Sequence, residues 1–62
     1  MVTNEIYLSD KQLAERYSTD RATIWAWVRT NDFPAPVKLA QQTTRWKLRE
    51  VEQWEKERKR LA

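Results

Sequence analysis

The feature that most constrains the fold is a pair of helix-capping signals placed close together near the start of the chain. In "LSDKQLAERY", Ser9 and Gln12 form a capping box, which predicts a short helix over about residues 10–17. In "STDRATIWAW", Asp20 is a second N-cap, and it predicts a helix that runs to about Thr30. Because so few residues separate the two helices, the sequence predicts a helix-turn-helix.

Two prolines end the helical part of the chain after this unit. Pro34 and Pro36 disfavour helix in "NDFPAPVKL", and Asn31 before them is a plausible left-handed cap. Apolar and polar residues then alternate in "PVKLA" and "TTRWK", which predicts the two strands of a hairpin with "AQQT" at its tip. Because the tip has neither glycine nor an Asn-Gly pair, we expect a loop longer than a two-residue primed turn.

A third helix is predicted for the stretch "LREVEQWEKERKRLA", where apolar residues recur at positions 48, 51 and 54. Two glutamates are followed one turn later by lysines in the orientation that stabilises helices, in the pairs Glu52 with Lys56 and Glu55 with Lys59. We expect this helix to end near residue 60.

The order helix, helix, hairpin, helix is that of a small winged helix. We therefore predict a mainly α fold with a small β-hairpin, a winged helix-turn-helix with a two-stranded wing. We expect residues 1–62 to form one domain, with an ordered core over about residues 8–58.

The composition removes the usual reinforcements of a small domain. The chain has no cysteine and no histidine, so it can form no disulfide and is not expected to bind a metal. It has no glycine either, which argues against a phosphate-binding glycine loop, and we expect no cofactor. The four tryptophans, each able to bury about 150–250 Å², are expected to supply the core.

The net charge of +3 and the pI near 9.6 are compatible with a polyanionic partner but do not require one. No stretch approaches the roughly 18 apolar residues of a membrane span, and "MVTNEIYLSD" lacks the features of a signal peptide. We expect a cytoplasmic chain that begins at its own initiator and does not associate with membranes.

The predicted second helix has two different faces. At about 100° per residue, Ile24, Trp27 and Val28 form one apolar stripe, which makes Trp27 the predicted core tryptophan. A second stripe on the other side consists of Ala22, Trp25, Ala26 and Arg29.

Small residues on that second stripe would let the helix backbone come close to the base edges of a DNA major groove. Thr30 is a further candidate for a phosphate contact. For Trp25 an alternative is that its ring packs sideways on the hairpin or an N-terminal segment while its indole N–H points outward, and for the arginines the alternative is a solvated surface. The candidate DNA-binding residues of this helix are Arg21, Ala22, Thr23, Trp25 and Arg29.

The hairpin is the second candidate contact with DNA. If Trp46, Val37 and Leu39 point inward, alternation places the basic residues on the opposite face, beside a polar tip. Such a wing can lie along the phosphate backbone or enter the minor groove, although its charges could instead only protect an edge strand. The candidate residues are Lys38, Gln41, Gln42, Thr43, Arg45 and Lys47, with Thr44 beside them.

Catalysis is not expected. The carboxylates Glu50, Glu52, Glu55 and Glu57 lie on one charged helix, with lysines to match them and no evident pocket. The basic stretch "KERKR" is accounted for by the preference of helix C-termini for positive charge.

The stretch "DRATIWAWVRTNDFPAPVKL" followed by "TRWKLREVEQW" resembles the AlpA-like prophage regulators, a family similar to excisionases and to the MerR-type winged helices. The resemblance extends from about Leu8 to about Glu57. Its most specific parts are "TIWAWV", "FPAPVKL" and "RW" leading to "EVEQW".

The chain departs from the family pattern at three places where that pattern usually carries glycine. These are the turn between the first two helices, the position before "FP" and the wing tip, where this chain has Ser18, Asn31 or Asp32, and the region of Gln41. We expect the fold to survive, because asparagine tolerates a left-handed backbone and a longer loop can close the wing.

The resemblance implies a DNA-binding regulator encoded in a bacterial prophage or another mobile element. Such proteins activate or repress prophage and integrase genes, or bend attachment-site DNA so that an integrase excises the element. By the resemblance, the positions of the recognition helix are Arg21, Ala22, Thr23, Trp25 and Arg29, that of the wing is Arg45, and those of the core are Ile24, Trp27, Val28, Phe33, Trp46, Val51 and Trp54.

The leading hypothesis is therefore a sequence-specific protein that binds double-stranded DNA, as a transcriptional regulator, an excisionase or both. Because so small a chain makes few phosphate contacts, we expect cooperative self-association on adjacent sites or a protein partner such as an integrase. An alternative is a small adaptor that binds another regulator through Trp25 and the third helix. A third is a phage packaging or structural component.

Overall fold

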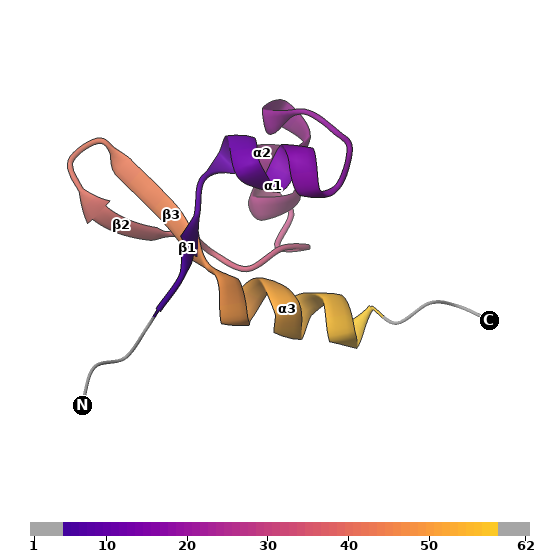
Figure 1. Ribbon diagram of the computed structural model, residues 1–62. Helices are drawn as coiled ribbons and strands as arrows, with labels where there is room; N and C mark the ends of the chain where they lie inside the picture. Colours follow the sequence, from indigo (N-terminus) through magenta and orange to yellow (C-terminus); the bar gives the residue numbers. More distant parts are fainter. Residues whose placement is uncertain (1–4, 59–62) are drawn as a thin grey trace.

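The computed structural model describes residues 5–58. Two helices lie together at one end of the molecule, a β-hairpin projects from its side, and the last helix closes the opposite end (Figure 1). In chain order the elements are β1 (Tyr7–Leu8), α1 (Asp10–Arg16), α2 (Arg21–Arg29), β2 (Val37–Ala40), β3 (Thr43–Lys47) and α3 (Leu48–Glu57).

Both predicted N-caps are confirmed. The Ser9 hydroxyl accepts from the Gln12 amide at 3.1 Å while the Gln12 side chain accepts from the Ser9 amide at 2.9 Å, which completes the capping box of α1. At the start of α2, the Asp20 carboxylate accepts from the Thr23 amide at 2.8 Å. These short-range bonds fix where the helix-turn-helix begins and where it turns.

Both helices end on a residue with a left-handed backbone. Ser18 has φ 56° after α1, and Asn31 has φ 63° after α2. The next amide in each case reaches back into the last turn, from Thr19 to the Ala14 carbonyl and from Asp32 to the Trp27 carbonyl, both at 2.8 Å. The prediction of a left-handed cap at Asn31 is confirmed, and serine takes the same conformation in the turn between α1 and α2.

The sheet has three strands in the order β1-β3-β2, and its short first strand was not predicted from the sequence. Tyr7 pairs with Lys47 and Leu8 with Trp46, both antiparallel, and the Leu48 amide donates to the Ile6 carbonyl at 2.8 Å. A strand of two residues is too short to produce the alternation by which strands are recognised in a sequence. Pairing with β3 is what holds the N-terminal segment in place.

The hairpin closes more tightly than predicted. Ala40 pairs directly with Thr43, so Gln41 and Gln42 alone form the loop, and the expectation of a longer loop is wrong. Neither glutamine has a positive φ, so the turn is not a primed one. A register shift between Lys38 and Ala40 adds a residue to β2 beside the turn, and such a bulge adjusts the twist of the strands.

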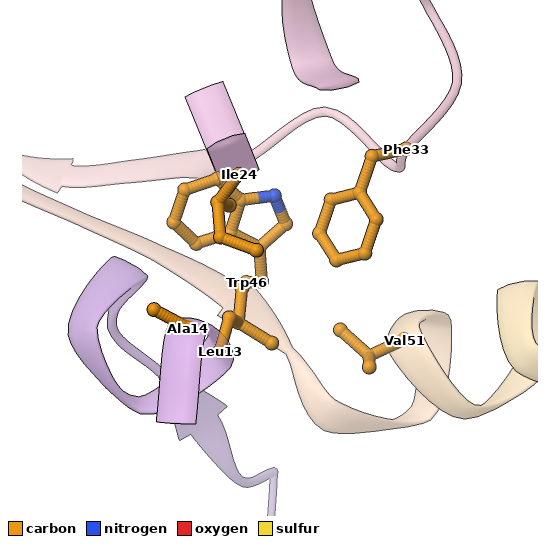
Figure 2. Packing of buried hydrophobic residues seen from close by; sticks show 6 residues of the cluster. All are labelled: Leu13, Ala14, Ile24, Phe33, Trp46 and Val51. Atoms are coloured by element: carbon orange, nitrogen blue, oxygen red, sulfur yellow. The ribbon is translucent and has the colours of Figure 1, made fainter. Parts of the chain in front are cut away.

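The core gathers around Trp46, which is fully buried (Figure 2). Side chains from α1, α2, the loop before β2 and α3 all point toward its indole. Its ring N–H donates to the Pro34 carbonyl at 2.8 Å, so that the polar atom of the buried ring is satisfied. The buried residues are Leu13, Ala14, Ile24, Phe33, Trp46 and Val51.

Two expectations about the core need correction. Trp27, the predicted core tryptophan of α2, packs against this cluster but is only half-buried, and so is Trp25, so α2 does not place one tryptophan in the core and the other in solvent. Leu39 is 48% exposed rather than inward, because the bulge at this point of β2 breaks the alternation of side chains.

The third helix ends at Glu57, earlier than expected, with Arg58 as its C-cap. Within residues 5–58 the ion pairs of its charged residues are made with other elements: Arg16 with Glu55, Glu5 with Arg49 and Asp32 with Arg58. Glu55 therefore has its partner on α1, and Lys59 lies outside the described residues. The tertiary fold, and not spacing along the helix, decides these pairs.

Candidate nucleic-acid interface

The outward side of α2 is small and basic. Arg21, Ala22 and Arg29 are exposed, and Ala26 is half-buried between them. The helix carries no acidic residue from Arg21 to Arg29. Its backbone is thus accessible along a side that presents two guanidinium groups.

Thr23 and Thr30, both predicted to contact DNA, form hydrogen bonds at the two ends of α2. The Thr23 hydroxyl donates to the Asp20 carboxylate at 2.7 Å, and the hydrogen bonds from Thr23 lower the pKa of that carboxyl group. The Thr30 hydroxyl lies within 3.2 Å of the Ala26 carbonyl and 3.1 Å of the Asp32 carboxylate. Each hydroxyl has one hydrogen to donate, and an acceptor in its own chain already faces it.

Trp25 packs against the core rather than facing outward. Its ring centroid is 5.1 Å from that of Trp46, and its indole N–H donates to the Asp10 carboxylate at 2.9 Å. The alternative interpretation, in which the ring packs sideways on the hairpin, is therefore confirmed. The idea that the N–H points outward is wrong, because α1 supplies an acceptor that the helical wheel of α2 alone cannot reveal.

Arg21 lies beside the same carboxylate. Its Nε is 3.9 Å from Asp10 Oδ2, and its side chain is 64% exposed. Asp10 thereby connects the start of α1 to the start of α2, and it is a residue of this site that the sequence did not reveal. Its only signal in the sequence is an acidic residue in the first turn of α1, which is explained equally well by the helix dipole.

The strand register divides the predicted basic wing between two faces. Directly paired residues of an antiparallel sheet have their side chains on the same side, and the pairs here are Val37 with Arg45 and Lys38 with Thr44. Since residues two apart in a strand share a face, Lys38 and Thr44 lie on the Trp46 side of the sheet. The prediction that Lys38 shares a face with Arg45 and Lys47 is wrong.

The two faces of the wing therefore differ in what surrounds them. α2 packs on the Trp46 face through Trp25, so Lys38 lies on the face of the sheet that carries α2. Arg45 and Lys47 lie on the other face with Tyr7 and Val37, and Arg45 donates to the Thr44 carbonyl at 2.8 Å. Of the loop, Gln41 and Gln42 are exposed and the following Thr43 is half-buried.

A surface hollow lies elsewhere, between the loop after α2 and the end of α3. Its lining includes Asp32, Trp54 and Arg58, which bond to one another: the Trp54 N–H and the Arg58 guanidinium both donate to the Asp32 carbonyl. Arg58 also lies over the Trp54 ring at 4.9 Å. None of the predicted DNA-binding residues lines this hollow.

The described residues were searched for metal sites and for membrane-spanning helices. Between residues 5 and 58, no three side chains of the types that bind metals come together as a possible ion site. Over the same part of the chain, no helix is long and apolar enough to cross a membrane.

Two capped helices joined by a tight turn, followed by a hairpin that packs against the second of them, define a winged helix-like DNA-binding fold. Within that class, the family described as prophage CP4-57 regulatory protein (AlpA) matches residues 7–60. The chain belongs to this family, as its resemblance predicted, and membership implies prophage regulation and DNA binding in general. No curated protein and no solved structure matches the chain.

Proposed function

We propose that this protein is a sequence-specific regulator of prophage genes that binds double-stranded DNA with α2 in the major groove. The observation that carries the proposal is the outward side of α2, where exposed Ala22 lies between the exposed Arg21 and Arg29. Arginine is the side chain that most often recognises guanine, and alanine can contact a thymine methyl without holding the helix away. Family membership supports DNA binding in general but assigns no residue.

The wing contributes through one face and its tip. Lys38 shares the sheet face on which α2 packs, and Gln41 and Gln42 are exposed at the end of the hairpin. With α2 in the groove, this face and the tip follow the phosphate backbone or the adjoining minor groove. Arg45 and Lys47, on the other face, contribute less to the same duplex.

Tight binding by so small a domain rests on several copies bound at adjacent sites or on a protein partner such as an integrase. Bound at an attachment site, such an array bends DNA and acts as an excisionase; bound at a promoter, it activates or represses. The protein acts without catalysis. The described groups with shifted pKa values have structural roles. Asp20 caps α2, and the contact between α1 and α3 is made by Arg16, Tyr17 and Glu55.

The alternative of an adaptor has lost its main argument, because Trp25 is packed on Trp46 and hydrogen-bonded to Asp10. The salt dependence of binding distinguishes an adaptor from a DNA-binding protein. Docking through an apolar patch responds little to salt, whereas DNA binding weakens steeply as salt is raised.

The test measures affinity for a duplex selected from a random library, against salt concentration, for single alanine variants. Arg21→Ala and Arg29→Ala are expected to weaken selected binding by roughly 1–3 kcal/mol if they contact bases. Lys38→Ala should weaken binding to all sequences and reduce the salt slope by about 1. Lys56→Ala, which removes the same charge from exposed α3, is the matched control and should leave the slope unchanged.

Two results would overturn the proposal. One is a wild-type protein that selects no sequence; the other is a set of α2 variants that bind the selected duplex as the wild type does. Loss of binding in Arg45→Ala but not in Lys38→Ala would place the duplex on the other face of the wing. The excisionase role requires the protein to bend DNA. Bending is measured from the electrophoretic mobility of the protein bound to circularly permuted fragments of the prophage's attachment site.

A further inference from the structure

The carboxylate of Asp10, on α1, lies next to the proposed recognition helix α2 and contacts two of its residues. One of its oxygens, Oδ2, accepts the indole N–H of Trp25 at 2.9 Å and lies 3.9 Å from Nε of Arg21. The Asp10 side chain is 28% exposed, and that of Arg21 is 64% exposed. The same oxygen thus accepts a hydrogen bond from a half-buried indole and lies near an exposed cation.

This arrangement connects Arg21 to the buried core of the molecule. Trp46 is fully buried, Trp25 packs on it with ring centroids 5.1 Å apart, and Trp25 in turn holds Asp10. Asp10 is also fixed from its own side, because it lies in the first turn of the capped helix α1. A long, exposed arginine at the start of α2 therefore has a neighbouring charge whose position is set by the core.

Such a charge affects DNA binding in two ways. It restricts the directions that the guanidinium takes, which reduces the entropy lost when Arg21 engages a base. It also offsets part of the attraction between Arg21 and phosphates of any sequence, which lowers non-specific affinity. Both effects raise the ratio of specific to non-specific binding.

We infer that Asp10 is a specificity-determining residue that positions Arg21 for base contact and restrains it from binding phosphates indiscriminately. This inference rests on the proposed role of α2 in DNA binding. Asp10 itself need not touch DNA; it acts through Arg21.

Asp10→Asn tests the inference because asparagine keeps an oxygen that can accept from Trp25 while it removes the charge that faces Arg21. Affinity is measured for the selected duplex and for a shuffled duplex of the same composition. We expect the ratio of the two affinities to fall about fivefold or more, comparable to a weakened base contact, and non-specific binding to gain about one unit of salt slope.

Glu5→Gln is the matched control. It removes one carboxylate charge from the Glu5–Arg49 pair, whose atoms are 3.4 Å apart, on elements other than α2. It should strengthen binding to both duplexes by the same factor and leave their ratio unchanged. Thermal unfolding and tryptophan fluorescence of each variant check that the fold is retained.

Arg21→Ala separates positioning from a general charge effect. In that background Asp10→Asn should leave the ratio of affinities unchanged, because the residue through which it acts is absent. The inference is wrong if Asp10→Asn alters both affinities equally, as the control does, or if its effect on the ratio persists without Arg21. A wild-type protein with no selectivity would instead overturn the proposed function itself.

Discussion

At the scale of single residues, the chain forms without glycine two turns that need a left-handed backbone. Ser18 and Asn31 adopt the left-handed backbone in these turns, with φ 56° and 63°. Asparagine tolerates that region better than serine does, because its side chain can bond to the local backbone. Ser18 is therefore the more strained of the two caps.

Ser18→Gly is expected to stabilise the protein by about 0.5 kcal/mol, since relief of the steric cost at positive φ exceeds the entropy that glycine adds to the unfolded chain. Urea unfolding followed by circular dichroism measures the change. Thr19→Gly is the control, because Thr19 has no positive φ and the added freedom should destabilise the fold. Equal effects of the two glycines would show that Ser18 is not strained.

At the scale of elements, α1 and α3 are joined by one polar cluster. The Arg16 guanidinium donates twice to the Glu55 carboxylate, at 2.7 and 3.0 Å, and the Tyr17 hydroxyl donates to the same group. The hydrogen bond from Arg16 is the main reason that the pKa of Glu55 lies below its ordinary value of 4.5. Burial, followed by the bond to Glu55, raises the pKa of Tyr17.

This cluster predicts a loss of stability in acid. Because the pKa of Glu55 is lower in the folded state than in the unfolded chain, its stabilisation is complete above pH 4.5 and is lost as the pH falls through the folded value. Glu55→Gln should cost about 1 kcal/mol at pH 7, a modest amount because both partners are about one-third exposed. The variant should also lose less stability than the wild type between pH 5 and about 3.

Urea midpoints across that pH range provide the measurement. Glu52→Gln is the control, since Glu52 is exposed on the same helix. An unchanged acid dependence in Glu55→Gln would mean that another carboxylate dominates acid unfolding, with Asp20, whose pKa is also lowered, as the first candidate.

At the scale of the whole molecule, six aromatic rings form one connected cluster that reaches every helix and the central strand. Trp25 contacts Trp46, Trp46 contacts Phe33, and Phe33 contacts Trp54 with centroids 4.8 Å apart. Trp27 stacks on Trp54 at 5.9 Å and also contacts Tyr17, the C-cap residue of α1. In a chain with no disulfide, this cluster supplies the packing that joins the elements.

Because both rings belong to this cluster, Trp25→Ala and Trp27→Ala should each destabilise the fold. Truncation of a buried tryptophan costs about 3–5 kcal/mol, so we expect losses of roughly 2–3 kcal/mol at these half-buried positions. Trp25→Phe retains a ring against Trp46 but removes the donor to Asp10, and it should recover most of the loss. Melting temperatures and urea unfolding measure the relative stabilities of these variants. Full stability in Trp25→Ala would show that the packing of Trp25 contributes nothing to the stability of the fold.

Much of the architecture follows from local rules and was predicted correctly. Capping boxes, helix-breaking prolines and alternation act between residues a few positions apart, so Ser9, Asp20, Pro34 and "TTRWK" mark element ends without reference to the rest of the chain. The candidate site was harder to predict. Arg21, Ala22 and Arg29 are exposed, as a surface contact requires, whereas the contacts of Trp25 depend on partners that only folding brings near.

The sequence by itself determined the order of the helices and where each begins, the position of the hairpin, the resemblance to its family and the basic residues of α2. Only the tertiary structure decided that Trp46 is the central tryptophan, that β1 pairs with β3, that Lys38 and Arg45 lie on opposite faces, and that Asp10 stands beside Arg21. The physical reason is how far apart along the chain the interacting residues lie. Caps and periodicity are set by neighbours along the chain, whereas strand register, a bulge and the partner of an indole N–H are set by segments that meet only when the core forms.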